Sequence, residues 1–143
     1  AAYAAPAVSQ DGRLAVARVL QAVGKMVWVE SEALLDPVTA VSGSGPAYVF
    51  YFMEALRDAA VELGLSAETA NTLVIETFAG AARLAVQGGD DVAALRERVT
   101  SKGGTTEAAL KSMARDRVKE AIVRAVGSAN ERARELGAEL GKT

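Results

Sequence analysis

The sequence contains no cysteine and no histidine among its 143 residues. Their absence excludes disulfide bonds, thiol nucleophiles, zinc sites made of Cys and His, and Ser-His proton relays. The adjacent carboxylates Asp90 and Asp91 are the remaining candidate metal pair. We expect them instead to form a solvated loop in which Asp91 caps a helix, so the sequence predicts no metal site.

The sequence also lacks a strong charge bias and a long hydrophobic run. Sixteen basic and eighteen acidic residues are interspersed and give a net charge of −2, which predicts no binding to nucleic acid or anionic membranes. The longest uncharged run, 37–53, is interrupted by Ser-Gly-Ser-Gly-Pro, whereas a membrane-spanning helix needs about 20 continuous apolar residues. The opening residues predict no signal peptide, and we expect the chain to be a fragment.

The first 30 residues predict one β-α-β unit. Ser9 is placed to cap a helix that ends near Gly24, and short extended runs lie on either side, at 2–4 and 26–30. Two strands cannot maintain a parallel sheet, so the partner strands must lie outside this chain or on another copy of it.

Everything after Asp36 reads as helical, so the predicted fold class is mainly α. Helices are expected to begin at N-capping or helix-initiating residues and to end at glycines, and Ser42–Gly45 is expected to break the first of them. The expected segments are 36–41, 46–63, 66–87, 91–98, one from Thr105, and one capped by Asp116 that continues to about Leu136 or beyond.

The helices expected at 46–63 and 67–86 are apolar on nearly every side. A helix that is hydrophobic all round is buried all round. Because the chain offers few other elements to cover these helices, we infer an intertwined helical dimer.

Two glycine-rich segments are candidate binding sites. Val99–Thr106 places Gly103 and Gly104 among four hydroxyl residues before a helix, so it is either a loop for a small anion or a flexible hinge with an ordinary Thr cap. Arg96, Arg98 and Lys102 flank this loop, although solvation is the default expectation for the arginines. Ser42–Pro46 is either a simple helix break or a place where a cofactor lies against the backbone.

Three phrases together resemble the C-terminal part of pyrroline-5-carboxylate reductases. They are Val-Thr-Ala-Val-Ser-Gly-Ser-Gly-Pro-Ala-Tyr at 38–48, Gly-Ala-Ala at 80–82, and the segment 95–113 with Val-Thr-Ser-x-Gly-Gly-Thr-Thr at 99–106. The resemblance covers essentially the whole chain in order and spacing, and Ser-x-Gly-Gly-Thr-Thr is its most specific phrase.

The resemblance implies a reductase that makes L-proline from 1-pyrroline-5-carboxylate with NAD(P)H. Residues 1–30 would be the last β-α-β of a Rossmann domain. Residues 31–143 would be an all-helical dimerisation and substrate-binding domain like that of 6-phosphogluconate dehydrogenase. The chain lacks the GxGxxG fingerprint, so NADP or NAD would be held mainly by the absent remainder of the Rossmann domain. The family also implies a cytoplasmic homodimer, often assembled into decamers.

The family's site residues transfer to two segments. Substrate binding falls on Val99, Ser101, Gly103, Gly104, Thr105 and Thr106, and the cofactor's nicotinamide end would meet Ser42, Gly43, Ser44, Gly45 and Pro46. Thr106, which matches the residue that hydrogen-bonds the ring nitrogen, is the candidate catalytic residue.

Two residues depart from the family pattern. Lys102 stands where proline is usual, and Glu76 stands where glutamine is common.

Two other interpretations of the whole chain are kept beside the reductase domain. They are a non-catalytic helical dimerisation module and another reductase of the 6-phosphogluconate dehydrogenase type.

Overall fold

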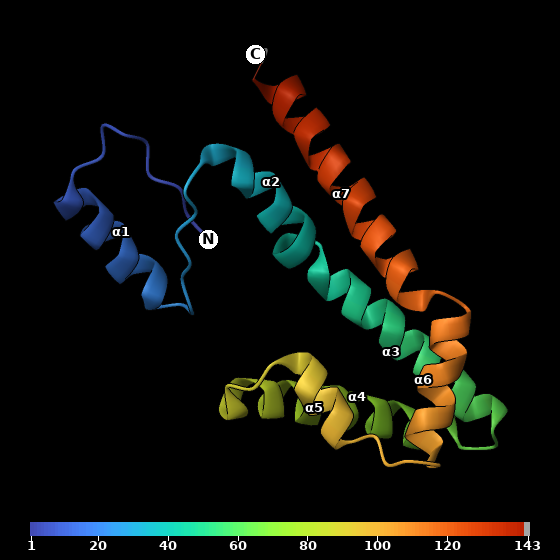
Figure 1. Ribbon diagram of the computed structural model, residues 1–143. Coiled ribbons are helices and arrows are strands. Elements are labelled where there is room, and N and C mark those ends of the chain that lie inside the picture. Colours follow the sequence, from blue (N-terminus) through green and yellow to red (C-terminus); the bar gives the residue numbers. More distant parts are fainter. Residues whose placement is uncertain (142–143) are drawn as a thin grey trace. The chain divides into compact units, whose positions relative to one another are not determined.

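The computed structural model describes residues 1–141, and its regular elements in that range are all helical (Figure 1). The predicted mainly α class is therefore confirmed. The elements are α1 (Gln10–Gln21), the 3-10 turn η1 (Glu32–Leu34), α2 (Leu35–Val38), the π-helical turn η2 (Thr39–Gly43), α3 (Gly45–Glu62), α4 (Ala67–Gly88), α5 (Val92–Arg98), α6 (Thr105–Arg115) and α7 (Val118–Leu140).

The predicted β-α-β unit is not formed, because residues 1–141 contain no strand. The two extended runs meet at a single parallel bridge between Ala2 and Trp28. Ala2 N–H donates to the Val27 carbonyl, and Val29 N–H donates to the Ala2 carbonyl, both at 3.0 Å. Two short segments without further partners make too few ladder bonds to be strands, so one bridge is all that remains.

Helix starts were predicted well where a short polar side chain precedes an apolar pattern. Ser9, Ser66 and Asp91 each have extended backbone and accept a hydrogen bond from an N–H in the following turn, as predicted. Gly89, with φ of 63°, takes the left-handed conformation that ends α4.

The segment before α3 differs from its prediction. The chain becomes helical at Glu32 rather than at Asp36, and the predicted break at Ser42–Gly45 narrows to one residue. Ser44 N–H donates to the Thr39 carbonyl at 2.9 Å, five residues back, which widens the turn to a π-helical one. The serines and glycines therefore widen the helical turn and leave a break of only one residue, Ser44, before α3.

Asp116 was expected to cap the last helix, and this was wrong. It lies at the C-terminus of α6, where its N–H donates to the Ser112 carbonyl at 3.0 Å. Arg117 follows with φ of 53°, and α7 begins at Val118. The reversal therefore uses a left-handed Arg117, a conformation uncommon for residues other than glycine.

The chain has little core of its own. It divides into two compact units, Pro46–Val123 and Ala1–Gly45 with the chain from Arg124 onward. Among the described residues only Ala4, Ala40, Ala70 and Val74 are buried apolar residues, and none with a large side chain is fully buried. Phe50 on α3 and Leu73 on α4, the two most apolar helices, stay 62% and 52% exposed. Exposed apolar surface on this scale indicates an interaction partner.

Helices α3, α4 and α7 are long, but none of the helices within residues 1–141 combines the length and apolar character needed to cross a bilayer.

The Ser66 cap gives a test of this helical framework. Ser66 Oγ accepts the Thr69 N–H at 3.1 Å, so Ser66→Ala should lower the free energy of unfolding by about 1 kcal/mol in urea denaturation. Ser128→Ala is the control, because its exposed hydroxyl bonds only the Arg124 carbonyl within α7. An equal loss in both variants would contradict the capping role.

Candidate functional site

The glycine pair of Val99–Thr106 forms a tight turn. Gly104 N–H donates to the Ser101 carbonyl at 3.1 Å, and Gly103 has φ of 75°, as the third residue of a type II turn requires. A Cβ on Gly104 would lie 2.5 Å from Ser101 Oγ and 3.1 Å from the Ser101 carbonyl oxygen. Both glycines are therefore needed for the shape of the loop, which makes it a defined turn rather than a loose hinge.

This turn delivers the chain directly into α6. Gly104 occupies the N-cap position with extended backbone, and no side chain caps the helix. The first-turn N–H groups of a helix have no acceptor within it, and the helix dipole adds positive potential at the same point. Thr105 and Thr106, the first two residues of α6, therefore present N–H groups suited to a small anion.

The side chain of Glu107, in α6, binds the turn through a backbone N–H. Its Oε2 accepts the Gly103 N–H at 2.7 Å, and Lys111 Nζ lies 3.1 Å from its Oε1. The hydrogen bond from Gly103, followed by that from Lys111, keeps the pKa of Glu107 below its ordinary value. Because the N–H groups of Gly103 and Gly104 are already hydrogen-bonded within the loop, the N–H groups of Thr105 and Thr106 are the first ones in α6 that are available to a ligand.

Sequence reasoning missed Glu107 and Lys111. A signal was available, because Glu107 follows the N-cap Gly104 by three residues, the spacing of a capping box, and precedes Lys111 by four. The N–H that Glu107 accepts is that of Gly103 rather than that of the N-cap residue Gly104, and this pairing goes with the positive φ of Gly103.

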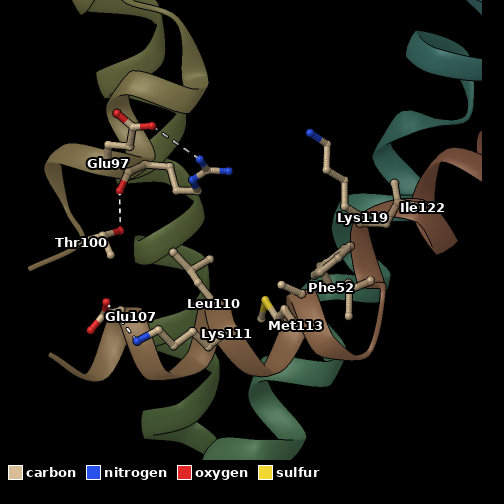
Figure 2. Close-up of a pocket in the computed structure, with 12 residues that line it drawn as sticks. Phe52, Glu97, Thr100, Glu107, Leu110, Lys111, Met113, Lys119 and Ile122 are labelled. Atoms are coloured by element: carbon tan, nitrogen blue, oxygen red, sulfur yellow. Dashed lines mark hydrogen bonds and ion pairs between the residues drawn. The ribbon is translucent and has the colours of Figure 1, made fainter. Parts of the chain in front are cut away.

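An open pocket of about 530 Å³ lies within the unit Pro46–Val123, beside the loop (Figure 2). Thr100 and Glu107, on the two flanks of the loop, both line it. Figure 2 shows Glu107 and Lys111 toward one end and Phe52 and Met113 farther along. The complete lining is Phe52, Arg96, Glu97, Thr100, Glu107, Leu110, Lys111, Met113, Ala114, Val118, Lys119 and Ile122. The pocket thus joins an apolar wall to a charged rim next to the glycine turn.

The flanking cations differ in their pairing. Arg98 is held by Asp90 at 2.7 Å, whereas Arg96 makes a loose 3.9 Å contact with its neighbour Glu97 and lines the pocket. Lys102 forms no ion pair with any other residue in the range 1–141. Arg96 and Lys102 are therefore better placed than Arg98 to attract an anion.

The remaining predicted loop residues are exposed. Val99 ends α5 and is 62% exposed, and Ser101 begins the turn that Gly104 closes. Thr100, which was not among the predicted site residues, fastens the loop by donating its hydroxyl proton to the Arg96 carbonyl at 2.6 Å.

The predicted cofactor segment 42–46 lies mostly in the other unit. Ser42 lines a second pocket, of about 470 Å³, together with apolar residues of the bridge and of α2 and η2 that include Val27, Val29 and Pro37. A Cβ on Gly45 would meet no atom within 4 Å, so the backbone there is open to another molecule. The structure therefore shows small residues and open backbone in this segment.

The fold and the site together define a helical domain that buries few apolar side chains and has a glycine turn leading into the uncapped N-terminus of α6. Residues 32–136 match the family described as pyrroline-5-carboxylate reductase dimerisation. The chain is 47% identical over 125 residues to the pyrroline-5-carboxylate reductase of Pseudomonas aeruginosa, covering 87% of this chain and 46% of that protein. A Bacillus subtilis enzyme of the same name is 41% identical over 128 residues, covering 90% and 46%. The chain belongs to the pyrroline-5-carboxylate reductase family and carries its dimerisation domain.

Solved structures agree with this assignment. A pyrroline-5-carboxylate reductase from Coxiella burnetii matches with a TM-score of 0.89 and 43% identity, over 94% of this chain and 50% of that one. A Plasmodium falciparum pyrroline carboxylate reductase with NADP bound matches with a TM-score of 0.82 and 32% identity, over 93% and 50%. The chain thus spans about half the length of the relatives that it matches.

The contact between Glu107 and Gly103 predicts a titration. The folded-state pKa of Glu107 is lowered, so the contact stabilises the fold at pH above the ordinary glutamate pKa, and this contribution is lost as pH falls through the folded pKa. The Gly103 amide resonance should therefore shift in acid with a midpoint below 4.5. Glu107→Gln should abolish that shift; its persistence in the variant would contradict the contact.

Proposed function

We propose that this chain supplies the dimer interface and the substrate pocket of an enzyme that reduces 1-pyrroline-5-carboxylate to L-proline with NADPH or NADH. The single observation that carries the proposal is the uncapped N-terminus of α6, which follows the Gly103–Gly104 turn and borders a pocket. A small cyclic imine with one carboxylate matches this combination of anion donors and apolar wall. Family membership supplies the reaction.

The turn and the first residues of α6 would bind the substrate. The N–H groups of Thr105 and Thr106 would donate to its carboxylate, with Arg96 and Lys102 adding positive potential. Val99 and Ser101 would line the ring, beside Gly103 and Gly104, whose role is to shape the loop. The Thr106 hydroxyl would bond the ring nitrogen.

The reaction needs a hydride and a proton. A bound NADPH or NADH supplies the hydride, which adds to the carbon of the C=N bond. The nitrogen takes up a proton, and the Thr106 hydroxyl is placed to pass one from water. Most of the rate enhancement would come from positioning, since no described side chain near the turn is an evident strong acid.

The cofactor would be shared with a second domain. Ser42–Pro46 would contact only its nicotinamide end, and residues 1–30 would complete the Rossmann domain of a longer protein. Residues 31–143 would form the helical domain. We place the activity in the cytoplasm.

The exposed helices would be covered by a second copy of the chain, giving a homodimer that is able to assemble further into a decamer. The apolar residues that α3 and α4 leave exposed are suited to this role. The alternative, a dimerisation module without catalysis, shares this interface but would not bind L-proline at the turn.

An activity assay tests the proposed reaction directly. The helical half of the Pseudomonas aeruginosa relative would be replaced by this chain, and oxidation of NADPH and NADH would be followed with 1-pyrroline-5-carboxylate. Thr106→Ala should lower kcat/KM about 10- to 100-fold, the value of a hydrogen bond to a charged group. Thr72→Ala, which loses only a bond to the Glu68 carbonyl, is the control. An inactive but folded and dimeric chimera, or an unaffected Thr106→Ala, would contradict the proposal.

The dimer is tested at Phe50, which is 62% exposed on α3. Phe50→Asp removes a large apolar side chain from the proposed interface and adds a charge, so the dimer Kd should rise at least about tenfold. Sedimentation velocity measures this change. Leu14→Asp, on α1 and outside the matched region 32–136, should leave the Kd unchanged. Equal Kd values for Phe50→Asp and the parent would place the interface elsewhere.

A further inference from the structure

The turn that presents the substrate-binding amides is built around Lys102 and Gly103. Gly104 N–H closes it onto the Ser101 carbonyl, which makes Lys102 the second residue and Gly103, with φ of 75°, the third. Proline is favoured at the second position of such a turn because its ring fixes φ near −65° in advance. This chain has lysine there, so the turn lacks that restraint.

A different restraint is present on the opposite side of the turn. Glu107 Oε2 accepts the Gly103 N–H at 2.7 Å, which fastens the third residue of the turn to the first turn of α6. Lys111, one helical turn further on, lies 3.1 Å from Glu107 Oε1. Since Glu107 is itself in α6, the bond ties the turn to the helix whose first amides bind the ligand.

We propose that Glu107 is a positioning residue that holds the Ser101–Gly104 turn in its binding shape and so replaces the restraint of a proline at position 102. Lys111 completes the arrangement in two ways. It fixes the Glu107 carboxylate by an i,i+4 ion pair, and it offsets a negative charge that would otherwise repel a ligand carboxylate. This inference rests on the proposed function, because it assigns the turn to carboxylate binding.

The backbone geometry allows a proline at position 102 to restrain the turn in place of the Glu107 hydrogen bond. Among the described residues, Lys102 N–H donates to no backbone acceptor, so a proline ring at this position removes no hydrogen bond. Lys102 is also not among the residues with positive φ. A proline that fits the native backbone stabilises it chiefly by restricting the unfolded or open chain, by about 0.4–1 kcal/mol.

Four proteins test the proposal: the parent, Glu107→Ala, Lys102→Pro, and the double variant. Two quantities are measured by NMR, namely the hydrogen-exchange rate of the Gly103 amide and the Kd for L-proline. Glu107→Ala should speed exchange at Gly103 about tenfold and weaken L-proline binding about tenfold, since a charge-assisted bond is lost. Glu107→Gln, which keeps an acceptor oxygen, should fall between the parent and Glu107→Ala.

The double variant distinguishes the restraint on the conformation of the turn from the hydrogen bond between Gly103 and Glu107. Lys102→Pro in the Glu107→Ala background should recover about two- to fivefold of the lost affinity, while exchange at Gly103 stays fast because its acceptor is still missing. Arg132→Ala, which removes ion pairs with Glu135 and Glu139 on α7, is the control for loss of a surface charge pair and should change neither quantity.

The outcomes distinguish this inference from the proposed function. Unchanged exchange and unchanged affinity in Glu107→Ala, or no recovery of affinity in the double variant, would overturn the positioning role. Absence of L-proline binding in the parent would contradict the proposed substrate. A rise in Gly103 exchange in Glu107→Ala would still support the Glu107 restraint in that case, because exchange is measured without ligand.

Discussion

The main physical constraint on this chain is that it buries too few apolar side chains to form a core of its own. Only four small or medium apolar residues are buried among the described residues, and the two most apolar helices, α3 and α4, keep large side chains exposed. Hydrophobic burial is the dominant favourable term in folding, so these helices need a second surface to cover them. The match to a dimerisation family gives that need a direct explanation. In the proposed homodimer, stability and association are linked, because the free energy of unfolding then depends on protein concentration.

The Ser101–Gly104 turn is ordered by local interactions and not by deep packing. The bond from Gly104 to Ser101, the bond from Gly103 to Glu107 and the ion pair to Lys111 all join residues within ten positions of one another. A site built in this way keeps its shape even where the surrounding domain is open. It leaves the first-turn amides of α6 without a side-chain cap, which is a cost to the helix that the proposed substrate carboxylate would offset.

Much of the helical framework could be predicted from sequence, because capping is local chemistry. Ser9, Ser66 and Asp91 were identified from a short polar residue before an apolar pattern, and each accepts the expected hydrogen bond. The serines and glycines at 42–45 were misread, since their low helix propensity does not reveal that a π-helical turn accommodates them. The pair of extended runs was predicted to form strands, and without the partner strands expected outside this chain it forms only the bridge between Ala2 and Trp28. In the site, the Gly103–Thr106 segment was found from its composition, whereas Glu107 was missed because its acceptor role depends on the φ of Gly103.

The central claim is that the first amides of α6 bind a carboxylate, and a crystal structure of the chain with L-proline tests it most directly. The account predicts that the carboxylate oxygens lie within hydrogen-bonding distance of the amide nitrogens of Thr105 and Thr106, with the ring nitrogen toward the Thr106 hydroxyl. L-proline bound elsewhere, with these amides facing only solvent, would contradict it.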